Sequence, residues 1–157
     1  MFMKKKIFYL CINILIIFTL VGCSNNRDIK KNNNSITDNN EVIAKVKIMI
    51  NNNLYTINLE DNETTRVFID LLPLEIVMNE LNGNEKYIYL DNSLPTNTYS
   101  PKHINKGDVM LYGNNCLVIF YKSFDTAYSY TKIGHIDNLE DLGNGRIKVK
   151  IEKERDA

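Results

Sequence analysis

The amino-acid sequence predicts a mainly β domain, a closed or nearly closed antiparallel barrel with one or two short helices. Two observations support this prediction. From about residue 42 onwards, short runs alternate between apolar and polar residues with the period of two that is typical of strands, and turns rich in Asn and Gly separate most of these runs. Seven or eight such strands are expected to close into a barrel, because closure leaves no sheet edge unpaired.

The first predicted element is a hairpin over residues 42–60. From Ala44 to Ile50, every second residue is apolar and the residues between them are Lys45, Lys47 and Met49. Apolar residues alternate with polar ones again from Tyr55 to Leu59, as expected for two half-buried strands. The run Asn51-Asn52-Asn53 lies between them and is typical of a turn.

A helix is predicted next. The side chain of Asp61 or Asn62 can cap it, the apolar residues between Thr64 and Leu72 fall at helical spacing, and Pro73 ends it. We expect this helix to cover one open end or face of the sheet.

Six later runs have strand character, and most are separated by turn residues that tolerate a positive φ. A second short helix is expected near residues 138–142, with Asp137 as its N-cap and Gly143 as its end. The expected strands are residues 75–81, 86–90, 109–112, 116–121, 127–133 and 146–152.

The N-terminal segment has the features of a lipoprotein signal peptide. Three lysines, Lys4 to Lys6, precede an apolar run over residues 7–21, which is too short to cross a bilayer as a permanent helix. The run ends in Leu20-Val21-Gly22-Cys23, which resembles the lipobox of bacterial lipoproteins. We therefore expect the protein to be exported and cleaved before Cys23. Cys23 is then expected to carry lipid, including palmitate, and this lipid anchors the protein to the cell membrane. The alternatives are an uncleaved anchor helix and an ordinary secretory signal with a chance cysteine.

These features divide the chain into three expected parts: a signal peptide (1–22), a lipidated cysteine with a flexible tether (23–40) and a barrel domain (41–157). The tether is rich in Asn and contains only Ile29 and Ile36 as large apolar residues, so it cannot bury enough surface to become ordered. Its root-mean-square span would be on the order of 20–25 Å.

Charge and cysteine content exclude several function classes. Of 19 basic and 19 acidic side chains, cleavage removes three lysines and no acid, which leaves a net charge near −3. This argues against nucleic acid or an anionic membrane surface as the ligand, because both are bound by clustered Lys and Arg. Cys11 leaves with the signal peptide and Cys23 carries lipid, so Cys116 remains, in an apolar run where a buried, inert thiol is expected.

Five stretches stand out within roughly residues 42–152: Leu81 to Tyr87, Leu94-Pro95-Thr96-Asn97, Ile104 to Tyr112, Leu117 to Tyr121 and Ser129 to Gly134. Taken together and in this order, they resemble the bacterial cyclophilin-like domain family. The resemblance implies an eight-stranded barrel like that of the cyclophilins, which are peptidyl-prolyl isomerases. It does not imply their activity, because cyclophilin catalysis relies on a groove arginine that Arg66, Arg146 and Arg155 do not match.

The residues do not form a recognisable catalytic, metal or cofactor motif. Gly107-Asp108 before an apolar run is typical of a turn whose carboxylate accepts from nearby backbone amides. His103 and His135 are too few for a metal site, which normally needs three or four donors. The sequence contains neither a Gly-x-Ser-x-Gly elbow nor a Gly-rich phosphate loop, so no catalytic residue, metal or cofactor is predicted.

Aromatic residues are the feature with most functional content. Several aromatic residues, most of them tyrosines, lie close together in the sequence between Tyr112 and Tyr130. Because Tyr joins an apolar ring to a polar tip, such a cluster could line a groove for a peptide or small ligand. The alternative is that the rings fill the barrel core and cover its outer sheet. Tyr128 and Tyr130 are expected to share one strand face as the exposed pair. The groove candidates are Tyr112, Phe120, Tyr121, Tyr128 and Tyr130, with Phe124 in the same stretch.

Three hypotheses follow. The first is a membrane-anchored, non-catalytic binding or interaction module whose ligand the residues do not identify. The second is a diverged peptidyl-prolyl isomerase that acts on exported proteins, although the missing groove arginine favours binding. The third is an accessory domain to a flavodoxin-type redox partner, because relatives of the family that this chain resembles occur beside flavodoxin-like domains. No basic patch or Gly-rich loop offers a seat for a flavin phosphate.

Overall fold

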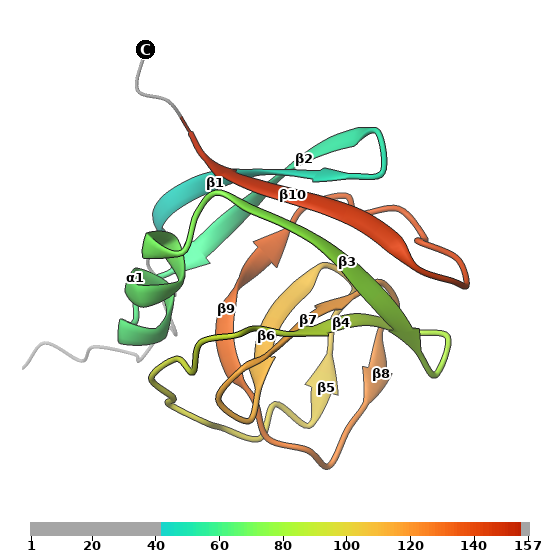
Figure 1. Ribbon diagram of the computed structural model, residues 1–157. Helices are drawn as coiled ribbons and strands as arrows, with labels where there is room; N and C mark the ends of the chain where they lie inside the picture. The colour runs from blue at the N-terminus through green and yellow to red at the C-terminus, as the bar shows by residue number, and fades with distance from the viewer. Residues whose placement is uncertain (1–41, 155–157) are drawn as a thin grey trace, which may run out of the picture. The chain divides into compact units, whose positions relative to one another are not determined.

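The computed structural model describes residues 42–154, and in this range it contains one helix and ten strands (Figure 1). No helix of this part is long and apolar enough to cross a membrane. The signal peptide, lipidated cysteine and tether expected over residues 1–40 lie outside the described residues. The elements are β1 (Val42–Ile50), β2 (Asn53–Glu60), α1 (Glu63–Asp70), β3 (Leu74–Leu81), β4 (Glu85–Tyr89), β5 (His103–Ile104), β6 (Asp108–Tyr112), β7 (Cys116–Phe120), β8 (Phe124–Asp125), β9 (Thr131–Ile136) and β10 (Ile147–Lys153).

Eight of these strands form a closed antiparallel barrel in the order β1-β10-β3-β4-β7-β6-β9-β2. The predicted closed barrel is therefore confirmed. The remaining two, β5 and β8, form a separate two-stranded sheet (Figure 1). The described residues 42–154 all belong to one compact unit, within which β1 pairs with both β2 and β10. Because closure leaves no barrel strand in need of an outside partner, this unit is expected to fold on its own.

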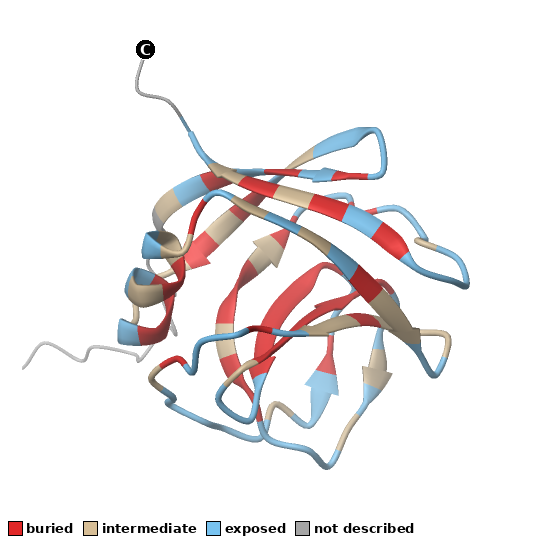
Figure 2. Cartoon of the chain, in the orientation of Figure 1, coloured by how far each residue is buried: buried red, intermediate tan, exposed pale blue. Residues whose placement is uncertain are grey.

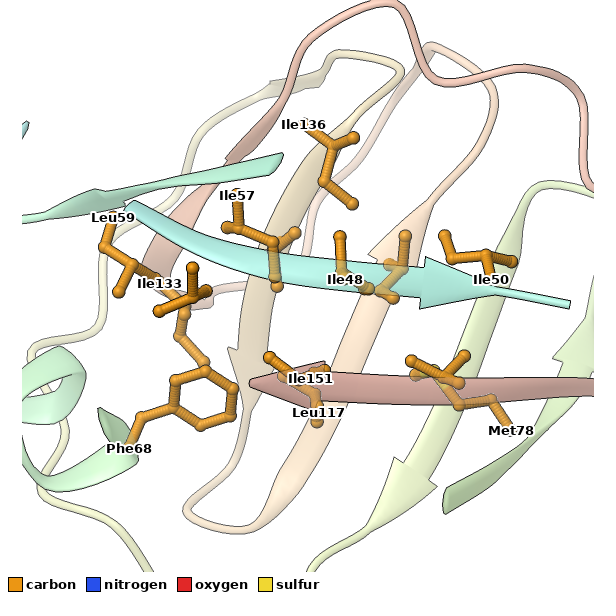
Figure 3. Close-up of a cluster of buried hydrophobic side chains, with 14 of the residues drawn as sticks. Ile48, Ile50, Ile57, Leu59, Phe68, Met78, Leu117, Ile133, Ile136 and Ile151 are labelled. Atoms are coloured by element: carbon orange, nitrogen blue, oxygen red, sulfur yellow. The ribbon is translucent and has the colours of Figure 1, made fainter. Parts of the chain in front are cut away.

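The main core fills the barrel interior. Along β1 and β10, buried apolar residues alternate with exposed or half-buried residues, which are polar except for Met49; this is the pattern on which the strand predictions rest (Figure 2). Figure 3 shows the inward side chains packed together, with Phe68 of α1 pointing into the same cluster. The labelled members of this cluster are Ile48, Ile50, Ile57, Leu59, Phe68, Met78, Leu117, Ile133, Ile136 and Ile151.

A second, smaller core lies on the outer face of β6 and β7. All five residues of β7 are buried, because Leu117 and Ile119 face the main core while Cys116, Val118 and Phe120 belong to the second (Figure 2). The β5–β8 sheet contributes Ile104 and Phe124 to this second core. A strand covered on both faces shows no apolar alternation, which accounts for the continuous apolar run at this position.

Asn62 rather than Asp61 caps α1. Its side-chain oxygen accepts from the backbone N–H of Thr65 at 2.8 Å, and the helix ends at Asp70, before Pro73. The fully buried Phe68 ties α1 to the main core, and burial of such a side chain contributes about 2–3 kcal/mol. The predicted helix is confirmed, with slightly shorter bounds.

The second helix expected near residues 138–142 is wrong. The carboxylate of Asp141 accepts from the backbone N–H of Gly143 at 2.8 Å, a local turn that competes with helical hydrogen bonding. Leu139 is buried in the main core, and Asn138 has a φ of 55°. The side chain of Asp137 accepts from Asn58 Nδ2 at 2.8 Å instead of capping a helix.

The strand expected over residues 127–133 begins later. The strand β9 starts at Thr131, and before it Tyr130 makes only an isolated bridge with Tyr99. This preceding segment packs on the outside of the barrel through its tyrosine rings rather than through a strand ladder.

One lysine side chain, that of Lys86, is fully buried inside the barrel. Lys86 on β4 is 0% exposed, and its Nζ donates to the carbonyl oxygens of Gly143 at 2.6 Å and Gly145 at 2.8 Å. The same Nζ lies 4.8 Å from the ring centroid of Tyr121, within cation–π range. Burial lowers the pKa of Lys86, which the negative charges of Glu80 and Asp141 partly oppose.

Candidate ligand-binding groove

A groove of about 280 Å³ lies on the outer face of β4, β7 and β6, beside the second core. Five of its ten lining residues are tyrosines. The complete lining is Leu81, Asn82, Glu85, Tyr87, Tyr89, Tyr112, Cys116, Val118, Tyr128 and Tyr130.

Strand register explains why these residues meet. Cys116 on β7 pairs with Tyr89 of β4 on one side and with Tyr112 of β6 on the other, and Val118 pairs with Tyr87. Because paired residues point to the same face of a sheet, the small side chains of β7 form a floor between tyrosines on both neighbouring strands. Bulky rings around a small-residue floor leave the hollow.

The segment before β9 adds two more rings. Tyr112 lies against Tyr128 with ring centroids 6.0 Å apart and nearly perpendicular planes, and against Tyr130 at 5.7 Å. Tyr130 in turn packs edge-on against Phe120 at 5.5 Å, which fixes it to the second core. Tyr87 and Tyr89 form another perpendicular pair at 6.0 Å. Edge-to-face pairs of this kind hold ring orientation.

Glu85 is the one acidic residue that lines the groove. Its side chain is half-buried, and it forms no ion pair with any described Lys, Arg or His. Its neighbour Lys86 points to the opposite face of β4, into the barrel. Burial, with the negative charge of Glu80 nearby, raises the pKa of Glu85. The groove therefore contains an uncompensated carboxylate among aromatic rings.

The thiol of Cys116 is a poor nucleophile. Burial, together with the charge of Glu85, raises the pKa of Cys116 to about 11. Cysteine reacts as the thiolate, and at neutral pH this group stays a thiol. It therefore acts as a small apolar part of the groove floor.

The structure brings together three of the five groove candidates, Tyr112, Tyr128 and Tyr130. Phe120 lies beneath Tyr130 in the second core, without lining the groove. Tyr121 lies in the main core, where its hydroxyl donates to Glu80 Oε1 at 3.3 Å.

Only one residue of the expected exposed pair, Tyr128, is exposed. Tyr128 is 63% exposed, whereas Tyr130 is 5% exposed. The expectation that both would be exposed on one strand face is wrong, because Tyr128 precedes the strand and Tyr130 is held between Phe120 and Tyr112.

Sequence reasoning missed the β4 side of the groove. Glu85, Tyr87 and Tyr89 alternate with Lys86 and Ile88, so period two alone places the acid and both tyrosines on one face. That signal could have been found. Its connection to the tyrosines of residues 112–130 depends on β4 lying beside β7, which only the topology reveals.

The two histidines pair separately with aspartates, away from the groove. His135 Nδ1 lies 3.1 Å from Asp108 Oδ1, and His103 Nδ1 lies 2.6 Å from Asp125 Oδ1. Asp108 also accepts from the backbone N–H of Asn105 at 2.9 Å, as expected for the Gly-Asp turn. Within residues 42–154 no group of three or more His, Cys, Asp or Glu could hold a metal ion.

A second hollow, of about 300 Å³, lies over β1, β10 and β3. It is more open to solvent, and its rim includes Met49, Glu75, Val77, Lys148 and Lys150. Lys150 pairs there with Glu75 and Glu152, so its charge is already compensated. The tyrosine-lined groove is the stronger candidate.

Comparison with known proteins supports the fold. A model of the cyclophilin-like family matches residues 48–152. The solution structure of the hypothetical protein AF2241 from Archaeoglobus fulgidus superposes with a TM-score of 0.57 at 21% sequence identity, covering 72% of this chain and 96% of that chain. This likeness concerns the fold alone. No curated protein is significantly similar in sequence.

Proposed function

Because this chain belongs to the cyclophilin-like family, we propose that residues 41–157 are a non-catalytic binding module whose tyrosine-lined groove holds a ligand. We further propose that lipid on Cys23 anchors this module to a membrane. The observation that carries the binding proposal is the convergence of five tyrosines from three separate segments on one hollow. Small-ligand sites are typically concave, mostly apolar and supplied with few polar groups.

The groove lining favours binding over catalysis. Its cysteine is a thiol at neutral pH, and neither described arginine belongs to the lining. Arg66 on α1 pairs with Asp61, and Arg146 directly precedes β10. The groove therefore offers shape, aromatic surface and one carboxylate, which suit recognition better than isomerase chemistry.

The anchoring proposal rests on the sequence motif Leu20-Val21-Gly22-Cys23 and the polar run after it. Two or three acyl chains hold a protein stably on a membrane, whereas one does not. We propose that the polar residues 24–40 act as a tether, so that the module would remain near the membrane while its groove stays open to the surrounding solution.

The binding proposal is tested by NMR titration of ¹⁵N-labelled residues 38–157 with four probe classes: small amines, carboxylic acids, neutral sugars and proline-containing tetrapeptides. We expect at least one class to shift the amide signals of Glu85, Tyr112 and Tyr128 in a saturable manner. Shifts confined to the β1–β10–β3 hollow, or none with any class, would contradict the proposal. Catalysed prolyl isomerisation of the tetrapeptides would contradict its non-catalytic part.

The anchoring proposal is tested in cells grown with labelled palmitate. We expect label on the full chain and its recovery in the membrane fraction, with both lost in the Cys23→Ser variant. Cys116→Ser is the matched control and should retain both, because Cys116 is buried in the second core. Labelling that survives in Cys23→Ser would refute lipidation at this cysteine.

A further inference from the structure

The charge of Glu85 restricts what can occupy the groove. This inference rests on the proposed binding function and deepens it by naming the ligand class. A ligand that covers the groove removes water from a carboxylate that has no ion-pair partner among the described residues. A neutral ligand would leave that charge uncompensated, and an anionic ligand would add repulsion. A cationic ligand both covers and neutralises it.

The rings favour the same ligand. The faces of aromatic rings attract cations, and an ammonium group within about 6 Å of a ring centroid gains most when it is desolvated. The tyrosines approach from both sides of the groove, with Tyr87 and Tyr89 on β4 facing the trio formed by Tyr112, Tyr128 and Tyr130. One carboxylate surrounded by rings is the arrangement that suits a bulky organic cation.

The lining also distinguishes methylated from unmethylated ammonium. A primary ammonium group needs hydrogen-bond acceptors for three N–H groups, and the lining offers it one carboxylate, that of Glu85, beside the neutral oxygens of Asn82 and the tyrosine hydroxyls. A quaternary ammonium has no N–H to satisfy, and its methyl groups can contact Val118, Cys116 and the rings directly. The groove volume of about 280 Å³ suits a small ligand.

We infer that the groove binds a small quaternary ammonium compound, with Glu85 as its counter-ion and the tyrosine rings as its cage. Glu85 supplies the charge, and Tyr128, which like Tyr89 is 63% exposed, closes over the methyl groups. The half-burial of an unpaired acid, which weakens the fold, is then explained by ligand recognition rather than by stability.

Calorimetric titration of residues 38–157 at pH 8 tests this inference with three probes: choline, its neutral isostere 3,3-dimethylbutan-1-ol, and ethanolamine. We expect choline to bind at least about tenfold more tightly than either of the others. Glu85→Gln should weaken choline binding about tenfold or more. Tyr128→Ala should weaken it several-fold.

Two variants serve as matched controls. Glu140→Gln removes an exposed charge outside the groove, and Leu54→Ala removes an apolar side chain that is 63% exposed, like Tyr128. Both should bind choline as the unmodified protein does. Equal binding of choline and its neutral isostere, tighter binding of ethanolamine, or full binding by Glu85→Gln would each overturn the inference. If choline fails while acids, sugars or peptides still shift the groove signals, this inference falls and the proposed binding function stands.

Discussion

The ring centroids of Tyr112 and Tyr130 lie 5.7 Å apart, one at the end of β6 and the other directly before β9. This contact joins two roles in one cluster, because Tyr130 is anchored on Phe120 in the second core while Tyr112 faces solvent at the groove rim. We therefore expect Tyr130 to contribute mainly to the stability of the domain and Tyr112 mainly to ligand binding.

Tyr128→Ala and Tyr130→Ala should have different effects on stability. Tyr128 is largely exposed, so its removal should change the free energy of unfolding by less than about 0.5 kcal/mol. Tyr130 is buried, and its removal should destabilise the domain by about 3 kcal/mol. Urea denaturation of both variants of residues 38–157 measures the difference. Equal effects would contradict the placement of Tyr130 in the second core.

Glu85→Gln should stabilise the domain in a pH-dependent manner. Burial raises the pKa of Glu85 above its ordinary value of 4.5, so the folded state binds this proton more tightly than the unfolded chain does. Stability from this group is therefore fully present below pH 4.5 and is lost as the pH rises through the folded pKa. The variant's advantage in Tm should be largest near pH 8 and vanish near pH 4. An advantage that grows on acidification would contradict this assignment.

Choline affinity should fall on acidification, for the same reason. Protonation of Glu85 removes the counter-ion, so binding should weaken as the pH falls through the raised pKa of this group. Glu80 on β3 and Cys116 on β7 are the other titratable neighbours that act on Glu85 or are acted on by it, together with the surrounding tyrosines. Repeating the titration in Glu80→Gln shows whether the dependence belongs to Glu85. The pH dependence should persist in Glu80→Gln, with its midpoint moved to lower pH because the charge of Glu80 no longer raises the pKa of Glu85, and it should be absent in Glu85→Gln.

Lys86→Ala should destabilise the barrel by about 2–4 kcal/mol. The substitution opens a cavity inside the barrel and leaves the carbonyl oxygens of Gly143 and Gly145 without their donor. Lys148→Ala on the exposed face of β10 is the matched control and should change stability by less than about 0.5 kcal/mol. Chemical denaturation compares the two. Similar small losses of stability in both variants would show that the hydrogen bonds of Lys86 do not stabilise the barrel.

Gly134→Ala should be far more harmful than Gly83→Ala. A Cβ at Gly134 would lie 2.4 Å from the carbonyl oxygen of Asn58 on the neighbouring strand, so the β2–β9 pairing would have to open. At Gly83 nothing lies within 4 Å, and only its φ of 70° opposes the change, at about 1 kcal/mol. Comparison of thermal unfolding should show a loss several times larger for Gly134→Ala.

The alternation of apolar and polar residues and the turn residues predicted the barrel well, whereas the groove depends on contacts between residues that are far apart in the sequence. Period two and Asn-Gly turns are properties of short segments, so β1, β2 and β10 follow from them directly. The expected helix near residue 140 failed because Asp141 and the Lys86 contacts stabilise an irregular turn. The groove needs β4, β7 and β6 side by side, and their order in the sheet is not their order in the chain. The tyrosine cluster in the sequence therefore predicted a binding surface, but it did not predict that Glu85 lies in the same groove.

Direct contact between a quaternary ammonium and the tyrosines is the most decisive measurement. Intermolecular nuclear Overhauser effects should be recorded between the methyl protons of choline and the ring protons of residues 38–157. We predict effects to Tyr112 and Tyr128 that become much weaker in Glu85→Gln at the same choline concentration. Effects to residues of the β1–β10–β3 hollow, or none at choline concentrations that saturate the calorimetric titration, would contradict the groove as the binding site.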